Sequence, residues 1–499
     1  MRIYIKLIFG LTLISMMTAC EVKVPQEYEK VQNKPSIYPD YTDVTIPCNI
    51  APMNFRIEME AEEYITQFAT PGGVWTIKGQ DVCHDINTWR AITESAMNHQ
   101  IDIEVYVRNG KSWKRFKPFT MCVKSDSIDP YLSYRLIAPS YVAYEDLVIC
   151  QRNLSDFEES IIFSNMLTSN EKDGQCINCH SYQNYNPDRM QFHGRQAHGG
   201  TLINYDGNIQ KVNLKTDSTI SAGVYPAWHP TAKLIAYSTN LTGQSFHTRD
   251  LQKVEVQDTQ SDLILYDLEA NRVYTVAQDS ADMECFPWWS PDGKYLYYCS
   301  AHYEKKDTTT LEFELIRNYK DIKYSLYRKS FDVQTLKFGP REMVFDAAAI
   351  GKSATLPRIS PDGKYLVFTL GGFGVFHIWH KDADLYMLDL QTGNVKPLTD
   401  MNSADVESYH SWSSNGRWMV VSSRRNDGNF TRPFFAYIDS TGMPHKAFEL
   451  PQKSPEYHRN MLRSYNIPEF MKGKVTVSSQ TLAKNMKQEA RKAIYSGRK

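Results

Sequence analysis

Four segments of the chain repeat one pattern, in which a short apolar stretch leads into a turn and then into a β-rich run. The turn reads Ser-Pro-Asp-Gly-Lys in two of the segments and Ser-Ser-Asn-Gly-Arg in a third. Asp-Gly or Asn-Gly between apolar runs favours a tight hairpin, because glycine adopts the positive φ that closes the turn. Each segment therefore predicts a β-hairpin. The segments are Tyr225–Lys233, Phe286–Lys294, Leu356–Lys364 and Tyr409–Arg417.

A second pair of strands is expected after each of these hairpins. Two hairpins per unit make a four-stranded sheet, and units that recur at intervals of about 50 to 70 residues are typical of a β-propeller with one blade per unit. The β-rich runs that begin the second pairs are Asp262–Leu268, Tyr324–Arg328, Asp384–Leu390 and Phe434–Asp439.

The sequence pattern Pro-x-Trp-Ser-Pro-Asp-Gly-Lys, followed by strand residues, resembles the TolB-type propeller repeat, a relative of the WD40 blade. The resemblance is most specific at residues 286–299 and 356–369, and it covers roughly residues 200–450. It implies a mainly β fold, a TolB-like (WD40-like) β-propeller of about five or six blades.

Two upstream segments complete the expected propeller. Residues 137–149 have the outline of a degenerate first hairpin, and residues 200–213 that of a second hairpin with an Asp-Gly turn. If both belong to one blade, residues 153–198 are an insertion within it. We therefore expect the propeller to span residues 131–450 and to carry this insertion.

The first twenty residues predict export. Arg2 and Lys6 precede an apolar run, Leu7–Met17, that is shorter than the roughly 20 residues a membrane span requires, so it indicates a signal peptide. The end of this segment, Met17-Thr-Ala-Cys20, resembles the lipobox of bacterial lipoproteins, which implies that Cys20 carries lipid. A plain secretory signal is the alternative. Residues 21–45 lack apolar periodicity and are expected to be a tether.

The regions on either side of the propeller do not show the repeat. Residues 46–130 predict a small β-rich N-terminal domain, with one helix near residues 87–97 and an alternating strand near residues 101–107. Residues 451–499 are expected to be a C-terminal tail with a short basic helix, since Leu482 and Met486 have helical spacing. This helix either packs on the propeller or contacts lipid or a partner.

The strongest chemical signal is the C-x-x-C-H motif Cys176-Ile-Asn-Cys179-His180. Two thiols at this spacing can bind the two vinyl groups of one haem, and the adjacent imidazole is then the proximal iron ligand. The motif resembles the attachment site of c-type cytochromes, which implies one covalent haem c. A thioredoxin-like pair, a zinc site and a simple disulfide are alternatives. The turn-rich sequence before Cys176 and the lack of a second C-x-x-C do not favour the first two.

Candidates for the second axial ligand lie downstream of the motif. His193 is the first choice and Met190 the second, so the expected metal ligands are His180 and His193. Arg195 is a candidate partner for a haem propionate, because a guanidinium pairs well with a carboxylate. For each of these three side chains the alternative is an ordinary structural or surface contact.

Other classes of function have little support. The 56 basic and 57 acidic side chains give a formal net charge of −1, which argues against nucleic acid as a partner. No nucleophile elbow, phosphate-binding loop or dinucleotide motif occurs, so no catalytic residue is assigned. The sequence thus predicts an exported lipoprotein of the cell envelope with an electron-transfer or other redox role, in which the propeller docks a protein partner. The alternative is an interaction or ligand-binding scaffold in which haem is structural, sensory or absent.

The remaining cysteines are expected to behave as those of an exported protein. Cys285 and Cys299 flank the Pro291-Asp-Gly293 turn symmetrically, so in a regular hairpin they lie opposite each other and can form a disulfide. Two buried free thiols are the alternative. Four further cysteines allow three pairings that the sequence does not rank: Cys48, Cys83, Cys122 and Cys150.

Overall fold

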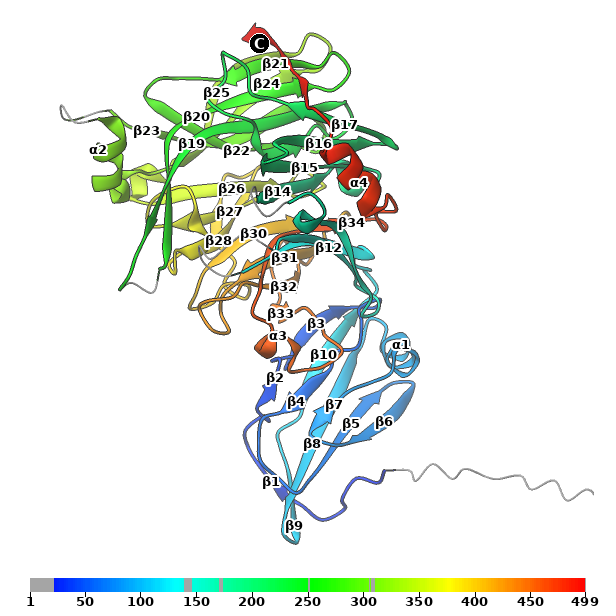
Figure 1. The fold of residues 1–499 in the computed structure, drawn as a ribbon. Helices are drawn as coiled ribbons and strands as arrows, with labels where there is room; N and C mark the ends of the chain where they lie inside the picture. Colours follow the sequence, from blue (N-terminus) through cyan, green and yellow to red (C-terminus); the bar gives the residue numbers. More distant parts are fainter. Residues whose placement is uncertain are drawn as a thin grey trace, which may run out of the picture.

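The computed structural model describes residues 22–138, 146–169, 174–249, 252–304, 306 and 310–498. The expected mainly β fold is confirmed, because the strands of these ranges form eight sheets and the helices are short. Figure 1 shows two parts: an N-terminal part in blue and light blue, and a larger assembly of sheets above it. The signal segment and Cys20 lie outside the described residues. None of the helices within the described ranges is long and apolar enough to cross a membrane.

The N-terminal part contains two sheets and one helix. Helix α1 (Ile86–Ser95) begins at Asp85, whose carboxylate accepts hydrogen bonds from the backbone N–H groups of Asn87 and Thr88 at 3.0 Å, as a capping residue does. The larger sheet contains β1 (Glu29–Lys30), β3 (Val44–Pro47), β5 (Glu63–Thr70), β6 (Gly73–Lys78), β8 (Gln100–Asn109), β9 (Ser112–Arg115) and β10 (Phe119–Lys124), and the smaller contains β2 (Ile37–Tyr38), β4 (Phe55–Ile57) and β7 (Asp81–Val82).

The segment expected to be a tether is instead largely part of this domain. It contains β1, β2 and the start of β3, and Ile37, Tyr41 and Val44 are buried in the core. Tyr41 also donates a hydrogen bond to the carbonyl of Glu449, in the other part of the molecule. The apolar residues are spaced irregularly between very short strands, and this is why they show no periodicity in the sequence.

Six of the eight sheets come from residues 131–498 within the described ranges. Each has four antiparallel strands, and two gain a further strand from the C-terminus. We number these sheets in chain order and give the inner strand first. Sheet 1 is β34 (Ser464–Met471), β11 (Tyr131–Ile137), β12 (Val148–Asn153) and β13 (Glu159–Ser164); sheet 2 is β14 (Gln175–Tyr182), β15 (Arg189–Gln196), β16 (Gly200–Tyr205), β17 (Asn208–Asn213) and β35 (Arg491–Lys492); sheet 3 is β18 (Val224–Trp228), β19 (Leu234–Phe246), β20 (Val254–Asp267), β21 (Arg272–Ala277) and β36 (Ile494–Arg498).

The other three sheets follow the same order without added strands. Sheet 4 is β22 (Asp282–Trp289), β23 (Tyr295–His302), β24 (Ser325–Asp332) and β25 (Lys337–Phe345); sheet 5 is β26 (Ser353–Ile359), β27 (Tyr365–Gly371), β28 (Asp384–Asp389) and β29 (Val395–Pro397); sheet 6 is β30 (Glu407–Trp412), β31 (Trp418–Ser423), β32 (Arg432–Tyr437) and β33 (Phe448–Glu449). The four repeat turns join the first two strands of sheets 3 to 6, so these hairpin predictions are confirmed.

The inner strands of the six sheets contact one another in a closed cycle. The order is β34, β14, β18, β22, β26, β30 and back to β34, which is the arrangement of a propeller. The cycle closes where β34, from the end of the chain, pairs with β11. Residues 451–499 are therefore not simply a tail, since they supply this inner strand as well as α3 (Tyr457–Asn460) and α4 (Ser479–Met486).

Residues 153–198 are likewise not an insertion. They contain β13, β14 and β15, which are strands of sheets 1 and 2. The predicted helix of the tail is present as α4, and it packs on the ring with Leu482 and Met486 buried against sheets 1 and 2. The remaining helix, α2 (Leu311–Arg317), lies between β23 and β24 in the chain.

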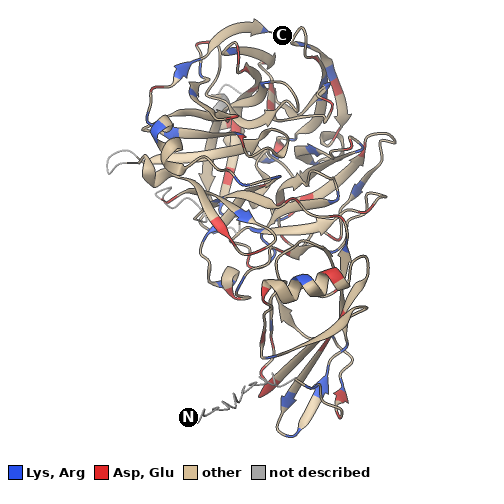
Figure 2. Ribbon diagram, turned by 90° about the vertical axis from the view of Figure 1, so that its right-hand side faces the viewer, with Lys and Arg blue, Asp and Glu red and all other residues tan. Residues whose placement is uncertain are grey.

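The N-terminal domain is bound to sheet 6 by direct hydrogen bonds. The indole N–H of Trp418 donates to the carbonyl of Asp126 at 2.8 Å, and the hydroxyl of Tyr437 donates to the Asp126 carboxylate at 2.9 Å. Arg459 and Glu58 form an ion pair across the same junction. Figure 2 shows basic and acidic residues interspersed over both parts, with no large region of one sign in that view.

Candidate functional site

The C-x-x-C-H motif lies on β14, the inner strand of sheet 2. Antiparallel pairing with β15 places Cys176 opposite Arg195, Asn178 opposite His193 and Tyr182 opposite Met190. The downstream candidates Met190, His193 and Arg195 are therefore all on the neighbouring strand. The register shifts between Asn178 and Ser181, which marks a β-bulge at the second cysteine.

Each inner strand has the same bulge at an equivalent position. One non-glycine residue per strand has positive φ: Cys179, Tyr225, Phe286, Leu356, Tyr409 and Ile467, with φ between 46° and 55°. Cys179-His180 therefore occupies the place at which four other inner strands have an apolar or aromatic residue followed by proline. In β30 the pair is Tyr409-His410, so a histidine at this position also occurs without a C-x-x-C motif.

His180 is enclosed and lacks a hydrogen-bond partner. The side chain is 1% exposed, and neither ring nitrogen makes a hydrogen bond with any described residue. It lies close to the backbone of Ser133 and Ile467, both in sheet 1. Burial, together with the nearby charge of Arg135, lowers the pKa of His180 to about 3, so its imidazole is neutral at physiological pH. A buried neutral imidazole without a partner is a potential metal ligand.

The two cysteines of the motif are free thiols with different exposure. Cys176 is partly buried, whereas Cys179 is 3% exposed and lies near the backbone of Tyr225 in sheet 3. Burial raises the pKa of the Cys179 thiol, and the charges of Arg195 and Arg135 oppose that shift. Cys179 and His180 therefore face neighbouring sheets on opposite sides of β14.

Arg135 is a part of this site that sequence reasoning missed. It is 6% exposed, and its guanidinium donates to the carbonyl of Ile177 at 2.8 Å and to the side chain of Asn466 at 3.0 Å. Burial lowers its pKa. Arg135 thereby ties β14 to sheet 1 beside the two thiols. No motif surrounds this arginine in the sequence, so only the three-dimensional fold identifies it.

The two candidates for a second axial ligand lie on opposite faces of β15. Met190 is 1% exposed and packs in the cluster between sheets 1 and 2, the side on which His180 lies. His193 is 5% exposed, and its Nδ1 is 3.1 Å from the hydroxyl of Thr201. Burial lowers the pKa of His193 to about 3. The fold thus brings Met190, and not His193, to the side of His180, while Arg195 is exposed opposite Cys176.

The chemistry of these donors fits a haem c, whereas the closed ring leaves little space around them. Two free thiols, an unpartnered imidazole and nearby guanidinium groups match the needs of thioether bonds, an iron ligand and propionates. The cavity that the described residues enclose at Cys179 and His180 has a volume of only about 20 Å³. The extended strand also directs Cys179 and His180 to different sides. A porphyrin can therefore join this strand only when β14 is displaced from its position in the ring described here.

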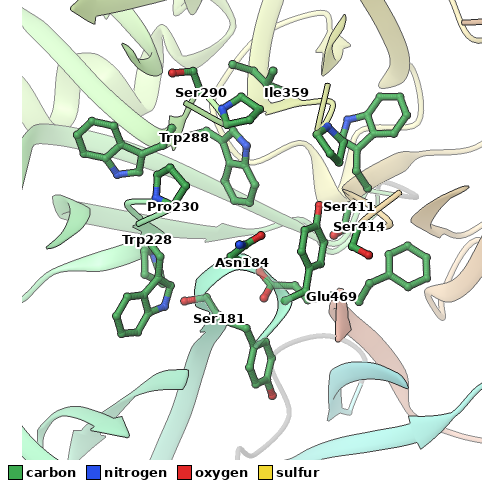
Figure 3. Close-up of a pocket in the computed structure, with 18 of the residues that line it drawn as sticks. Ser181, Asn184, Trp228, Pro230, Trp288, Ser290, Ile359, Ser411, Ser414 and Glu469 are labelled. Atoms are coloured by element: carbon green, nitrogen blue, oxygen red, sulfur yellow. The ribbon is translucent and has the colours of Figure 1, made fainter. Parts of the chain in front are cut away.

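A much larger cavity lies beside this point on the axis of the ring. Its volume is about 340 Å³, and all six sheets contribute to its wall. Figure 3 shows the lining, with Glu469 and Asn184 near its centre and Trp228 and Trp288 along its wall. The aromatic residues that line it are Tyr182, Tyr185, Trp228, Trp288, Trp289, Trp412 and Phe470.

The repeat explains why this cavity is aromatic. In each inner strand the third residue after the positive-φ residue is Tyr182, Trp228, Trp289, Ile359, Trp412 or Phe470, and all six line the cavity. The second residue faces the axis in most strands and is Glu469 in β34. Glu469 could not be recognised in the sequence, because the inner strand to which it belongs has no Asp-Gly turn after it.

Other histidines and cysteines of the propeller have structural surroundings. The His229 ring accepts a hydrogen bond from the N–H of Ala232 at 2.9 Å, and the His410 Nε2 lies 3.0 Å from the carbonyl of Val367. Cys285 and Cys299 lie directly opposite each other on β22 and β23, as their spacing predicted, and both are free thiols here. The described cysteines Cys48, Cys83, Cys122 and Cys150 are also unpaired.

No protein-family model and no curated protein matches this chain. Among solved structures, the GH74 enzyme of Niastella koreensis has a TM-score of 0.38 at 12% identity, over 63% of this chain and 44% of that one. Prolyl oligopeptidase B from Galerina marginata has a TM-score of 0.34 at 10% identity, over 81% of this chain and 54% of that one. The Cps50 (Swd1) β-propeller domain of Myceliophteria thermophila has a TM-score of 0.28 at 10% identity, over 55% and 86%. The chain thus spans about half the length of the first two.

Proposed function

We propose that this protein is an exported, lipid-anchored, six-bladed propeller of TolB type that carries one covalent haem c at Cys176, Cys179 and His180 and transfers electrons to a partner in the cell envelope. The observation that carries the proposal is His180, a buried neutral imidazole without a partner directly after a C-x-x-C pair of free thiols. A haem bound there supplies one-electron chemistry at its iron.

The protein's own residues have distinct tasks in this proposal. The thiols of Cys176 and Cys179 would form the thioether bonds, and the neutral imidazole of His180 would bind the iron. Met190 is the stronger candidate for a second ligand, because it shares the sheet 1 side with His180. Arg135 and Arg195 are the cations whose charges act on the Cys179 thiol, and each is a candidate partner for a propionate.

Burial of the motif implies an order of events. In the closed ring Cys179 is 3% and His180 is 1% exposed, so neither is accessible to a reaction partner. Attachment therefore requires β14 to lie outside the ring, and β14 stays displaced in the haem-bound chain, because the closed ring leaves only about 20 Å³ at Cys179 and His180. A chain that is exported unfolded past a haem-attachment system meets this condition.

A haem-stained denaturing gel is the direct test. The full-length protein is made together with a c-type haem-maturation system, and its mass is measured after denaturation. We expect a stained band, a mass increase of one haem, and a reduced-minus-oxidised spectrum of a c-type centre. Cys176→Ala should weaken covalent haem staining. The double variant Cys176→Ala with Cys179→Ala should abolish it. The matched double variant Cys285→Ala with Cys299→Ala is the control and should retain it.

Two further results decide the role of the imidazole and the proposal itself. His180→Ala should keep a covalent attachment but change the absorption spectrum, because the thioethers remain and the axial ligand is lost. Wild-type protein without any covalent haem after coexpression would overturn the redox proposal. The propeller would then be an interaction or ligand-binding scaffold.

A further inference from the structure

The axial cavity has the form of a binding pocket that is closed at its base. Its volume of about 340 Å³ is in the range of small-ligand pockets. The neighbouring cavity of about 20 Å³, lined by the positive-φ residues Cys179, Tyr225, Phe286, Leu356, Tyr409 and Ile467, leaves no wide passage along the axis. A ligand therefore enters from the face at which the inner strands end.

The aromatic wall is held in place before any ligand binds. The indole N–H of Trp289 donates to the carbonyl of Ala227 at 3.1 Å, and that of Trp412 donates to the carbonyl of Arg358 at 3.2 Å. These bonds join neighbouring sheets, so the rings are fixed by the closed cycle itself. A fixed wall lowers the entropy cost of binding.

Among the described residues that line this cavity, Glu469 is the single acidic or basic side chain, and the other ionisable side chains are tyrosines. It forms no ion pair within the described part of the chain, and the backbone of Tyr182 lies close to its carboxylate. Arg358 lies near, but its guanidinium stacks on Trp288 at 4.1 Å and donates to the carbonyl of Pro357 at 2.9 Å. Glu469 therefore has no direct ion pair among the described residues, although the charge of Arg358 acts on it from nearby.

We propose that the axial cavity binds a small organic cation, an ammonium group on a short apolar body, with Glu469 as its counter-ion and the indole rings as its wall. Aromatic faces attract cations, most strongly in tryptophan, and a quaternary ammonium loses little hydration on entering such a wall. The contact of Arg358 with Trp288 is an internal example of the same attraction. The inference concerns the closed ring described here, in which Tyr182 of β14 lines the cavity, and it does not require a haem.

The ionisation of Glu469 predicts that the affinity of the cavity for a cation depends on pH. Burial raises the pKa of Glu469 to about 8, and the charge of Arg358 opposes that shift. Tyr182 and Tyr185, which also face this carboxylate region, have raised pKa values and stay neutral. In the empty pocket Glu469 is thus mostly protonated at pH 6, and a bound cation favours the charged form. Affinity for a cation should rise with pH up to about 8, with release of one proton.

Titration calorimetry of the full-length protein in detergent tests the charge requirement. Choline and its uncharged isostere 3,3-dimethylbutan-1-ol are the probes, since they differ in one atom and in charge. At pH 8 we expect choline to bind at least about tenfold more tightly than the alcohol. Between pH 6 and pH 8 the affinity for choline should increase about tenfold or more, and that for the alcohol should stay constant.

The variants assign the effect to named residues. Glu469→Gln should lower choline affinity at least about tenfold at pH 8 and remove its pH dependence, while binding of the alcohol stays unchanged. Glu60→Gln, an exposed glutamate of the N-terminal domain, is the matched control and should change nothing. Trp288→Leu should weaken choline binding through the loss of one aromatic face.

Three outcomes would overturn the proposal. The first is equal affinity for choline and its isostere. The second is no binding of choline or tetramethylammonium at millimolar concentration. The third is selective binding of neutral sugars with no dependence on Glu469. The comparison of the two isosteres needs only wild-type protein, so a misfolded Glu469→Gln variant would not prevent the test. Presence or absence of haem in the same preparation is measured independently by the denaturing gel.

Discussion

Leu132 of β11 pairs directly with Phe470 of β34, although 338 residues separate them in the chain. Their strands are the first strand of the ring and the last of its inner strands in chain order, and both side chains are fully buried, at 0% and 1% exposure. This contact joins the two ends of the propeller in one sheet. Because the ring closes through this sheet, loss of the pairing should destabilise the whole assembly of six sheets.

Leu132→Ala should therefore strongly destabilise the propeller. Removal of a fully buried leucine side chain typically costs about 2 to 5 kcal/mol, through lost burial and the cavity that remains. We expect a lower urea midpoint in a single cooperative transition. Leu462→Ala is the matched control, because that leucine is 72% exposed and should contribute less than about 0.5 kcal/mol. Equal midpoints for the two variants would contradict closure by β11 and β34.

A second prediction concerns the junction between the N-terminal domain and the ring. The carboxylate of Asp129 accepts hydrogen bonds from the backbone N–H of Ser414 at 2.6 Å and from its hydroxyl at 2.7 Å. Asp129→Ala leaves both donors without a partner, which costs about 1 to 3 kcal/mol when the groups are buried.

Thermal unfolding and limited proteolysis measure this effect. The variant should unfold at a lower temperature and be cut faster near residues 126–130. Asp217→Ala replaces an exposed aspartate of the ring and should leave both measurements unchanged. A variant at Asp129 as resistant as the wild type would show that other contacts, such as those of Trp418, are sufficient.

The hairpins of sheets 3 to 6 could be predicted because their turns are local. Gly293, Gly363 and Gly416 have φ between 68° and 75°, and the residue types needed for such turns are visible in a single short segment. Sheets 1 and 2 lack this signal at their first turn. The pairing of β34 with β11 is non-local, and the buried alternation of Ser464–Met471 is too short to indicate an inner strand without its partner.

The site was only partly predictable for a related reason. The segment Cys179-His-Ser-Tyr182 aligns with Tyr409-His-Ser-Trp412 of the propeller repeat. The C-x-x-C-H motif in the same segment indicates a cofactor site, so this match to the repeat is easily overlooked. That alignment would have placed the motif on an inner strand. Glu469 and Arg135 have no local signature, since what defines them is the neighbouring sheet, and only the closed ring brings them to the axis or to the thiols.

A third prediction concerns Cys285 and Cys299. They are opposite each other on paired strands and both are fully buried, and the Sγ of Cys299 lies 3.3 Å from the carbonyl of Cys285. In an exported protein we expect oxidation to a disulfide that closes a loop of about 15 residues and stabilises the fold by about 3 kcal/mol.

Mass spectrometry of protein alkylated under denaturing conditions without reductant tests the pairing. The peptide that holds both cysteines should remain unmodified and gain two alkyl groups only after reduction. Exposed Cys83 provides an internal control for a thiol that is accessible to the reagent before unfolding. Alkylation of both Cys285 and Cys299 without reductant would instead identify two buried free thiols.

The last prediction is acid sensitivity caused by buried histidines. Burial lowers the pKa values of His180, His193, His377 and His410 to about 3, against about 6.5 in an unfolded chain. Between these values the unfolded state binds more protons than the folded state, so stability falls as the pH falls below about 6.5. Each such histidine should contribute a loss of about 1.2 kcal/mol between pH 6 and pH 5.

In His410→Gln, whose amide can still donate to the carbonyl of Val367, the free energy of unfolding should fall by about 1.2 kcal/mol less over that interval. The exposed His99→Gln is the control and should keep the wild-type difference. An unchanged difference in His410→Gln would mean that this ring is already protonated in the folded protein, and it would contradict the buried neutral imidazole that the geometry of sheet 6 requires.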